Sequence, residues 1–471
     1  MRIILKFYII RMKLLITVML CFAIIQISLQ GSKEDWKKRT IYQILTDRFA
    51  RTDGSTSACS NYRTYCGGTF VGVKNNLDYI QGMGFDAIWI SPIIDNFEDG
   101  YHGFWAKNWT QLNFNFGTQQ EFIDLVQECH NRGIWVMVDI VANHVGPCHL
   151  NYSRVYPFNQ DSHYHAYCNI GDGDWTQNQW KVENCRLADL PDLQQENAFV
   201  NSFLLSWVKD LVTTYHIDGF RVDTTSLVPK WFWDSFASSA GVFTMGEVYD
   251  RRLDYVFGYI GHLDSVLNYP LSWKIKYSFK GASFYDNIIS TIDAEIAMIG
   301  DKMDYLGLFF DNHDQPRFLC DWSNDDNLLG AMAFLLFFKG IPIIYYGDEQ
   351  QFTGPSDPYN REPLLTSMNP TSKNYQFLKA AINVRKTYHI WDYPYIQLWN
   401  GDHLLAFTRG NVLVILTAGS CYQESDVNNI PYPDGTVICN QLKQGDCVTI
   451  RNGGTAHFSV GPDETKLYTR N

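Results

Sequence analysis

Short runs of mostly apolar, β-branched and aromatic residues recur along the chain, and stretches with helical periodicity separate them. The apolar runs are 41–46, 87–92, 134–141, 219–223, 243–248, 265–269, 306–311 and 341–346. Helical periodicity is clearest over 119–132, 198–215 and 327–339. Near-continuous apolar strands that alternate with helices are typical of a parallel sheet covered on both faces. The eight apolar runs therefore predict an α/β fold, namely a (β/α)8 TIM barrel.

Two regions depart from this alternation. Residues 146–192 are rich in Asn, Gly, Asp and His, which indicates an inserted loop domain after the third strand rather than a crossover helix. After Arg385 the pattern changes to short runs, such as 404–408 and 412–416, that turn residues separate. This pattern predicts an antiparallel β domain at the C-terminus. The expected organisation is a signal peptide at 1–30, a barrel at 31–143 and 198–388, an inserted domain at 144–197, and a β domain at 389–471.

The composition narrows the class of protein. The chain has 471 residues, of which 46% are hydrophobic and 15% aromatic, so it has ample material for a buried core and is not disordered. The formal net charge of −12 argues against nucleic acid as a partner. We expect a monomer that binds a neutral or cationic ligand.

The N-terminus has the pattern of a secretory signal. Basic residues precede an apolar run at 14–25, and small and polar residues follow at 28–32. A membrane anchor is the alternative, but the apolar core of about a dozen residues is short against the roughly 20 needed to span a bilayer. We therefore expect cleavage near residues 28–33, a product released outside the cell or into the lumen of a digestive compartment, and no membrane association afterwards.

The cysteines fit an oxidising compartment. Of eleven cysteines, Cys21 lies in the expected signal, and the even number that remains permits disulfides. Close spacing favours the pairs Cys59–Cys66, Cys168–Cys185 and Cys439–Cys447. The pairing of Cys129, Cys148, Cys320 and Cys421 stays open, with Cys129 on a helical pattern expected to be a buried thiol. Sequons at Asn108 and Asn151 are candidate glycosylation sites.

The expected carboxyl ends of the barrel strands are unusually polar. Charged residues occur at 139–144, 218–223, 246–247 and 311–314. Charged groups at a core-facing barrel mouth cost free energy unless they are paired or functional. Because active sites of such barrels lie at this end, the convergence of these segments predicts a site.

The residue types at this mouth suit glycosidic bond cleavage. Strand periodicity puts Arg221 and Asp223 on one face, where the guanidinium would favour an ionised carboxylate. Glu247 follows a mostly apolar run that would favour its protonated form. A nucleophilic carboxylate and a proton-donating carboxyl about 5–5.5 Å apart make up a retaining glycosidase site. Taken alone, Arg221–Asp223 is more often a structural ion pair, and the Asn-His segments at 143–144 and 312–313 are explained as loop turns; only the ordered set indicates a site.

In order and spacing, the segments 139–144, 219–223, 246–248 and 312–314 resemble the four signature regions of the α-amylase family. The similarity is closest to the secreted fungal-type enzymes, through 67–69, 101–105, 190–192, 268–270, 340–345 and 360–362. It covers the mature chain nearly end to end and is weakest after about residue 390.

The resemblance implies a role for each matching position. Asp223 would be the nucleophile, Glu247 the general acid/base and Asp314 the transition-state stabiliser. The implied sugar-binding residues are His102, Phe104, Trp105, His144, Arg221, His313, Asp357 and Arg361.

Calcium is the cofactor that the resemblance implies. A hard cation takes several oxygen ligands from different segments. The matching ligands are Asn143, the carbonyl of Glu183, Asp192 and the carbonyl of Leu227. The alternative for Asp192 is that it caps the helix that follows.

One departure bears on function. Ser226 and Leu227 stand where the fungal-type enzymes have Lys and His that help to hold sugar on the leaving-group side. The expected activity is endohydrolysis of α-1,4-glucosidic bonds in starch- or glycogen-type polysaccharides or malto-oligosaccharides by a secreted, calcium-dependent, retaining enzyme. The alternatives are an α-glucosidase or transglycosylase and, against the presence of all three acids, an inactive partner subunit.

Overall fold

The computed structural model describes residues 31–320, 324–418, 422–462 and 464–470. The expected signal peptide, with Cys21, and the residue Cys421 lie outside this part of the chain. Among the helices of these described ranges, none has the length and apolar character to cross a membrane.

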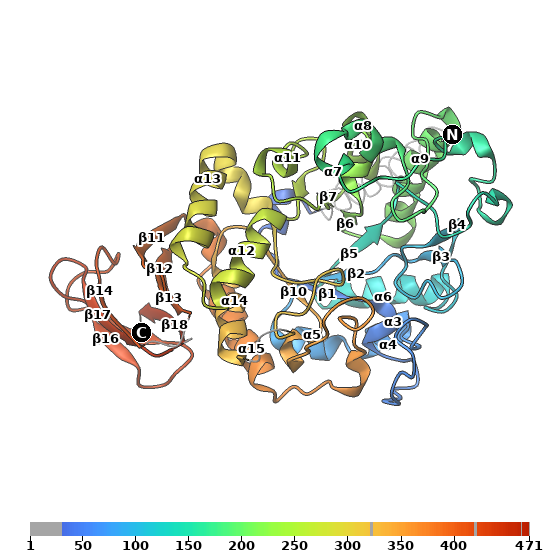
Figure 1. The fold of residues 1–471 in the computed structure, drawn as a ribbon. Coiled ribbons are helices and arrows are strands. Elements are labelled where there is room, and N and C mark those ends of the chain that lie inside the picture. The colour runs from blue at the N-terminus through green and yellow to red at the C-terminus, as the bar shows by residue number, and fades with distance from the viewer. Residues whose placement is uncertain (1–30, 321–323, 419–421, 463, 471) are drawn as a thin grey trace, which may run out of the picture.

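Within the described ranges, eight parallel strands form the sheet at the centre of the molecule (Figure 1). They are β1 (Ile41–Ile44), β2 (Ala87–Ile90), β5 (Trp135–Ile140), β6 (Gly219–Val222), β7 (Phe243–Gly246), β8 (Ser265–Val266), β9 (Gly307–Leu308) and β10 (Ile341–Tyr345). Their order is β8-β7-β6-β5-β2-β1-β10-β9, and a parallel bridge between Leu267 and Gly307 joins the two edges. The predicted (β/α)8 barrel is confirmed, and each strand falls within a predicted apolar run.

Helices surround this barrel and begin at recognisable caps. Thr118 and Glu121 form a capping box at the start of α6 (Gln119–Asn131), and Asn197 caps α9 (Ala198–Tyr215). The remaining helices that pack around the strands are α4 (Phe70–Asn75), α5 (Leu77–Met83), α10 (Lys230–Ala240), α11 (Leu253–Phe257), α12 (Tyr269–Phe279), α13 (Ser290–Ile299), α14 (Asp325–Phe337) and α15 (Lys373–Thr387). Short helices α2 (Lys33–Trp36) and α3 (Thr46–Phe49) flank β1. The three helices predicted from periodicity begin and end within two residues of their expected limits.

Side chains alternate between the barrel interior and the layer under the helices. Phe220 and Val222 of β6 belong to the large core beneath the helices, as strand periodicity predicts. Met137 and Met245 belong instead to the core inside the barrel. Trp36 closes this inner core, with its ring stacked at 5.3 Å on Phe243. Apolar packing thus fills the barrel, and polar side chains gather where the strands end.

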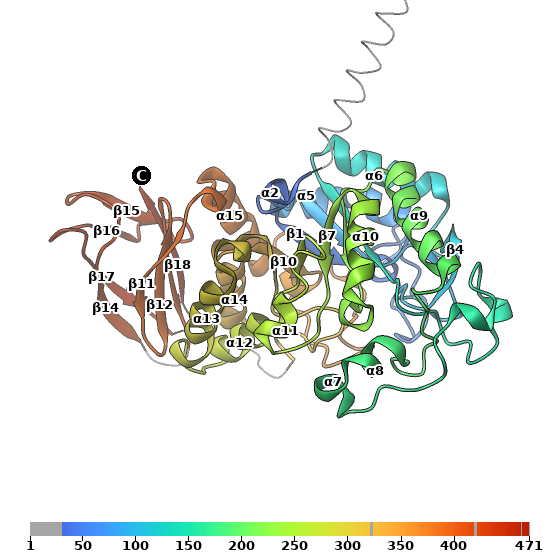
Figure 2. The same ribbon diagram turned by 90° about the horizontal axis from the view of Figure 1, so that it is seen from above.

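The predicted insertion after the third barrel strand, β5, is present and carries little regular structure. It contains α7 (Asp174–Gln177) and α8 (Gln179–Asn184), while the hairpin β3 (Ile94–Asn96) and β4 (Ala106–Leu112) precedes it in the chain. α8 packs against the turn that follows β6. Figure 2 shows α7 and α8 at the rim of the barrel. The insertion therefore borders the carboxyl ends of the strands.

The C-terminal part is antiparallel, as expected. Among its described residues a six-stranded sheet has the order β11-β12-β13-β18-β15-β16, and β14 pairs with β17. The strands are β11 (Tyr395–Asn400), β12 (Leu404–Arg409), β13 (Val412–Thr417), β14 (Gln423–Val427), β15 (Val437–Asn440), β16 (Cys447–Thr449), β17 (Ala456–Val460) and β18 (Thr465–Arg470). This sheet packs on α14 (Figure 1). The fold class is confirmed, and the domain limits at 143, 197 and 388 stay predictions.

The predicted disulfides Cys59–Cys66, Cys168–Cys185 and Cys439–Cys447 are all present. Cys129 is a buried free thiol, as expected. The pair Cys168–Cys185 ties the two sides of the insertion together around α7 and α8.

A buried carboxyl group sits in the helical layer. Glu295 of α13 is inaccessible to solvent, and its Oε2 accepts a hydrogen bond of 2.9 Å from Asn268 Nδ2. Burial raises the pKa of Glu295 to about 8, although the bond from Asn268 opposes the rise. The folded protein therefore keeps this proton at neutral pH.

The variant Glu295→Gln is expected to gain stability relative to the wild type as pH rises. An unfolded glutamic acid loses its proton near pH 4.3, so folding of the wild type takes up a proton between that pH and about 8. Wild-type stability should fall over this window by roughly 1–4 kcal/mol relative to the amide. Urea unfolding at pH 5 and pH 8 measures the difference. The exposed control Glu424→Gln should show no such trend, and a pH-independent difference for Glu295→Gln would contradict the buried, protonated state.

Candidate active site

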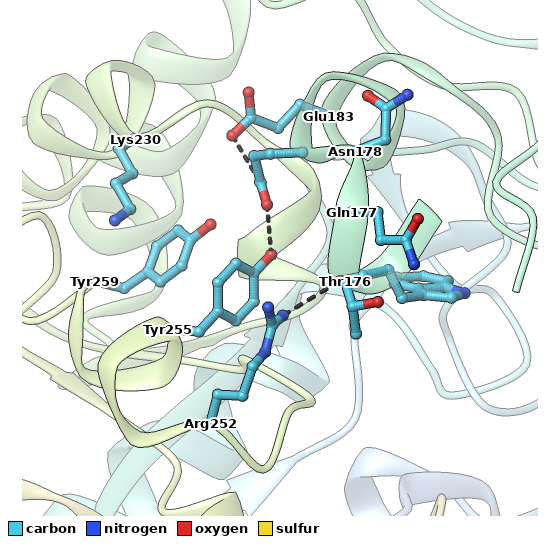
Figure 3. A pocket seen from close by; sticks show the side chains of 10 residues that line it. Thr176, Gln177, Asn178, Glu183, Lys230, Arg252, Tyr255 and Tyr259 are labelled. Carbon is cyan, nitrogen blue, oxygen red and sulfur yellow. Dashed lines mark hydrogen bonds between the residues drawn. The ribbon is translucent and has the colours of Figure 1, made fainter. Parts of the chain in front are cut away.

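A cleft of about 700 Å³ opens at the carboxyl ends of the barrel strands. Most of the site residues expected from the sequence line it: His102, Phe104, Trp105, His144, Asp223, Leu227, Glu247, His313, Asp314, Asp357 and Arg361. Arg221 lies beneath the floor, and Glu183 lines an adjoining pocket (Figure 3). Asn143 is buried just before the inserted segment, and Asp192 is buried within it. The polar strand ends thus meet in one place.

Arg221 is the cation at the floor of the cleft. It is inaccessible to solvent, and its Nη1 donates to both carboxylate oxygens of Asp139, at 2.9 and 3.0 Å. The same atom lies 2.7 Å from Asp223 Oδ1, while Nη2 lies 2.7 Å from Glu247 Oε1. One guanidinium therefore holds the two candidate catalytic carboxyl groups close together.

Charge at this floor is shared among several acids. Burial raises the pKa of Asp223 well above its usual range; Arg221 opposes the rise, and Glu247 and Asp139 add to it. Burial likewise raises the pKa of Asp139 to about 7. The sequence-based expectation that Arg221 keeps Asp223 ionised considered one pair, whereas the structure gives Arg221 more than one carboxylate to neutralise. A proton gained or lost by one acid of this cluster therefore changes the pKa of the others.

Glu247 is fixed by hydrogen bonds from two sides. Its Oε2 accepts from the backbone N–H of Thr224 at 3.0 Å, and its Oε1 accepts from Tyr269 Oη at 3.0 Å. Asn312 Nδ2 in turn donates to Tyr269 Oη at 3.1 Å. Tyr269 was not assigned a role from the sequence, although it lies in the matching segment 268–270, which was the available signal.

Asp314 is the most open of the three acids. Its side chain is 39% exposed, and it accepts a hydrogen bond of 3.1 Å from Arg361 Nη2. His313 Nε2 lies 3.2 Å from its other oxygen. The backbone N–H of Asp314 donates to Asn312 Oδ1 at 2.8 Å, which fixes the turn after β9. Asp314 thus faces the cleft from a rigid support.

Neutral histidines and an aromatic ring form one wall. The ring of Phe104 stacks on His313 at 5.0 Å with an interplanar angle of 5°, and it also stacks on His102 at 5.7 Å. Burial lowers the pKa of His102 and of His313 well below the usual range. Burial also lowers the pKa of His144 to about 4, and its Nε2 lies 3.2 Å from the Phe104 carbonyl. Uncharged imidazoles at this wall offer hydrogen bonds to a neutral ligand.

The cleft continues past Asp314 towards Arg361 and Asp357. Arg361 Nη1 contacts Asp357 Oδ1 at 3.0 Å and donates to Tyr101 Oη at 3.2 Å. Arg361 is buried, but Asp357 is exposed. This end therefore presents a fixed carboxylate to solvent.

The other end of the cleft has residues that the sequence did not single out. Trp175, Tyr249, Asp250 and Tyr255 line it with Ser226 and Leu227. Tyr249 is 57% exposed, and its hydroxyl accepts from Gln315 Nε2 at 3.1 Å. Trp175 lies in the irregular insertion and Tyr255 in a five-residue helix, where no motif or periodicity marks them.

Oxygen atoms converge beside the insertion. The side-chain oxygen of Asn143 faces Asp192 Oδ1 and the Leu227 carbonyl oxygen, each 3.0 Å away. Rotation of the amide would instead let its nitrogen donate to both. Asp192 Oδ2 lies 2.6 Å from His165 Nδ1, and burial raises the pKa of Asp192 to about 7. Asn197 rather than Asp192 caps α9, so the capping alternative for Asp192 does not hold.

This donor set suits a hard cation. Amide, carboxylate and carbonyl oxygens are the ligands that Ca²⁺ prefers, and adjacent oxygens without a donor between them repel unless a cation or a rotated amide intervenes. Clusters of three or more His, Cys, Asp or Glu side chains able to hold a metal are absent from the described ranges. Any site here therefore depends on amide and main-chain oxygens.

Comparisons with known proteins agree with this geometry. Residues 43–392 match the family model for the α-amylase catalytic domain. The chain is 43% identical to α-amylase 2 of Schwanniomyces occidentalis over 86% of this chain and 85% of that protein. It is 37% identical to the α-amylase of Saccharomycopsis fibuligera over 93% and 92% of the two chains. The structure of an α-amylase from Malbranchea cinnamomea superposes with a TM-score of 0.89 at 36% identity, covering 93% of this chain and 98% of that one.

Replacement of Arg221 by Met is expected to destabilise the fold strongly. The variant leaves Asp139, Asp223 and Glu247 buried without the cation they share. Loss of one partner from a buried ion pair costs about 3–5 kcal/mol, and protonation of the acids at lower pH should reduce that cost. Urea unfolding at pH 7 and pH 5 measures both effects. Arg252→Met, which removes a 39%-exposed partner of Asp250, should cost less than about 1 kcal/mol. Equal losses for the two variants would contradict the account.

Proposed function

The chain belongs to the α-amylase family of glycoside hydrolases, and we propose that it cleaves internal α-1,4-glucosidic bonds of starch- or glycogen-type polysaccharides with retention of configuration. The observation that carries the proposal is the contact of one buried guanidinium with both Asp223 and Glu247 at 2.7 Å beneath an open cleft. Two carboxyl groups held this close fit double displacement through a covalent intermediate.

In the first step the carboxylate of Asp223 attacks the anomeric carbon. Glu247 gives its proton to the glycosidic oxygen, the bond to the leaving glucan breaks, and a glycosyl ester forms on Asp223. In the second step Glu247 takes a proton from water, whose oxygen displaces Asp223 and regenerates the original configuration. The hydrogen bonds from Thr224 and Tyr269 hold the Glu247 carboxyl in place for both transfers.

The remaining residues of the cleft would hold and distort the sugar. Asp314, supported by Arg361 and His313, would bind hydroxyl groups more strongly as the ring flattens. Phe104 and Trp105 offer aromatic faces, and His102 and His144 offer uncharged ring nitrogens. Asp357 and Arg361 would bind the next glucose towards the non-reducing end. These roles require a neutral polyol, which an α-glucan supplies.

A second activity within the family has one observation in its favour. Ser226 and Leu227 replace the Lys and His that hold sugar on the leaving-group side in the fungal-type enzymes. Weaker binding there would favour an α-glucosidase or transglycosylase acting on short malto-oligosaccharides. The inactive-subunit alternative conflicts with the presence of Asp223, Glu247 and Asp314 in one cleft.

We propose calcium as a structural cofactor. Asn143, Asp192 and the Leu227 carbonyl fit it, because the side-chain amide of Asn143 lies 3.0 Å from Asp192 Oδ1 and from the Leu227 carbonyl oxygen. The Glu183 carbonyl would complete the set. The ion would neutralise these oxygens and pin the insertion to the turn after β6. That turn carries Thr224, whose N–H positions Glu247, so the ion would stabilise the site without entering the reaction.

Secretion and a monomeric state complete the proposal. The signal-like pattern of residues 1–30 and the disulfides of the described ranges both suit an oxidising extracellular compartment. The substrate is then a polymer outside the cell.

The variant Asp223→Asn is expected to lose at least about 1,000-fold in kcat on soluble starch, because an amide does not form the glycosyl ester. Reducing ends and iodine colour, followed together with calcium present, measure both activity and mode. Wild-type enzyme should bleach the iodine complex while few reducing ends appear. The exposed control Asp172→Asn should behave as wild type.

Two results would count against these assignments. Substantial turnover by a folded Asp223→Asn variant would remove Asp223 from the role of nucleophile. Reducing sugar that accumulates while the iodine colour persists would mean exo-action and would favour the α-glucosidase alternative.

Chelation is expected to lower the melting temperature by about 3–6 °C, since an ion bound only to the folded state stabilises it by mass action. Asn143→Ala should melt near the chelated wild type and should respond little to chelator. The exposed control Asn131→Ala should keep the full response. Differential scanning calorimetry with metal content verified measures this, and an unchanged melting temperature after metal removal would contradict a stabilising calcium site.

A further inference from the structure

A buried amide inside the barrel, that of Gln43, lies beside the cleft without lining it. Gln43 belongs to β1 and is 2% exposed. Ile41, two residues before it, is part of the apolar core inside the barrel, and strand periodicity puts Gln43 on the same face. Within the described ranges Gln43 Oε1 has no hydrogen-bond partner. A polar side chain that is only half satisfied in a packed interior indicates a role in the site.

The nitrogen of this amide contacts the wall of the cleft. Gln43 Nε2 lies 3.0 Å from Nδ1 of His313, which lines the cleft. The imidazole is confined, because Phe104 stacks on it at 5.0 Å and Trp89 packs against it edge-on at 6.3 Å. The second ring nitrogen, Nε2, lies 3.2 Å from Asp314 Oδ2. One imidazole therefore joins Gln43 to Asp314.

A single hydrogen is shared between the two ring nitrogens of His313. Burial, with Arg221 and Arg361 nearby, lowers the pKa of His313 well below its usual range, so the ring is neutral. A neutral imidazole has one nitrogen that donates and one that accepts. Because Nε2 faces an oxygen of Asp314, the hydrogen belongs on Nε2. Nδ1 is then left to accept from the Gln43 amide.

The reverse arrangement would bring lone pairs together. If Gln43 presented Oε1 to Nδ1, the ring hydrogen would have to move to Nδ1. The lone pair of His313 Nε2 would then face the Asp314 oxygen at 3.2 Å without a donor between them, which is costly in a buried site. The N–H of Gln43 therefore favours the form of His313 that can donate to Asp314.

We propose that Gln43 is a positioning residue for the reaction: its amide N–H holds His313 by Nδ1, so that the ring hydrogen on Nε2 points at Asp314 and the cleft. Asp314 then has a donor on each oxygen, from Arg361 Nη2 on Oδ1 and from His313 on Oδ2. This inference rests on the proposed function, in which Asp314 binds the sugar more strongly as its ring flattens. Gln43 itself touches no substrate and acts through His313.

The first test locates the ring hydrogen in the wild-type protein. Nitrogen NMR of protein that carries isotope-labelled histidine distinguishes protonated from unprotonated ring nitrogens, and the His313 signals are assigned by their loss in His313→Gln. We expect a protonated Nε2 and an unprotonated, hydrogen-bonded Nδ1. A hydrogen on Nδ1 of His313 would overturn the proposal. This measurement needs no substrate.

The second test removes the donor. Gln43→Met has a side chain of similar length, so the Nδ1 signal should move as its hydrogen bond is lost. On soluble starch kcat should fall about three- to ten-fold, the effect of one hydrogen bond, while KM changes less than about two-fold, because the loss acts through Asp314 in the transition state. Gln43→Asn keeps the amide but is one methylene shorter, and it should resemble Gln43→Met rather than wild type.

A matched control separates positioning from stability. Asn440 of β15 is also buried, and its Nδ2 donates to Asp446 Oδ2 at 3.0 Å. Asn440→Leu should lower stability to urea but leave kcat and the His313 signals unchanged.

Three results would overturn the proposal: an Nδ1 signal that stays in place in the Gln43 variants, a wild-type kcat, or a loss that falls wholly on KM. If Gln43→Met does not fold, the wild-type signal and Gln43→Asn still decide. Failure of the wild type to cleave starch would instead defeat the proposed function, and the NMR signals would still show whether Gln43 holds His313.

Discussion

The ion pairs of Arg221 depend on the register of the barrel strands. Asp139 of β5 and Arg221 of β6 are paired across the sheet, and Arg221 is paired in turn with Met245 of β7. Asp223 and Glu247 each follow two residues later on their own strands, so all these side chains reach the same end of the barrel interior. A slip of one residue in β6 would turn Arg221 into the helical layer, where a charge without partners is very costly. The catalytic geometry and the fold are therefore stabilised by the same contacts.

Successive strands add the remaining parts of the site to this centre. Hydrogen bonds run from Glu247 to Tyr269 after β8, and from Tyr269 to Asn312 after β9. Asn312 also accepts from the N–H of Asp314, so Glu247 and Asp314 share one rigid support. The insertion contributes at the rim, where Asp192 lies 3.0 Å from the side-chain amide of Asn143 beside the turn that positions Glu247. The loops thus line the rim of the cleft, while the barrel strands fix the positions of the carboxyl groups at its floor.

The strands and helices were predictable because the barrel strands are buried on both faces and read as continuous apolar runs. The place of the acids at the barrel mouth was predictable because Asp223 and Glu247 directly follow the strands β6 and β7, and Asp314 comes three residues after the run 306–311. Trp175 and Tyr255 were not, since their positions depend on how an irregular insertion and a short helix pack together. The raised pKa of Asp223 was also beyond the sequence, because the pattern shows that Arg221 is near but shows neither the burial of Asp223 nor the competition from Asp139 and Glu247. The sequence pattern identifies neighbours along one strand, such as Arg221 and Asp223. How the charge of Arg221 is shared can be worked out only from its contacts with acids on the neighbouring strands.

The central claim is that Asp223 forms a covalent bond with the substrate. The most direct measurement is mass spectrometry of the enzyme after brief reaction with an activated, fluorinated α-maltosyl substrate whose intermediate breaks down slowly. The account predicts a glycosyl adduct on the peptide that contains Asp223, and none on the corresponding peptide of Asp223→Asn. An adduct on another acid, or turnover that gives the inverted anomer as first product, would contradict it.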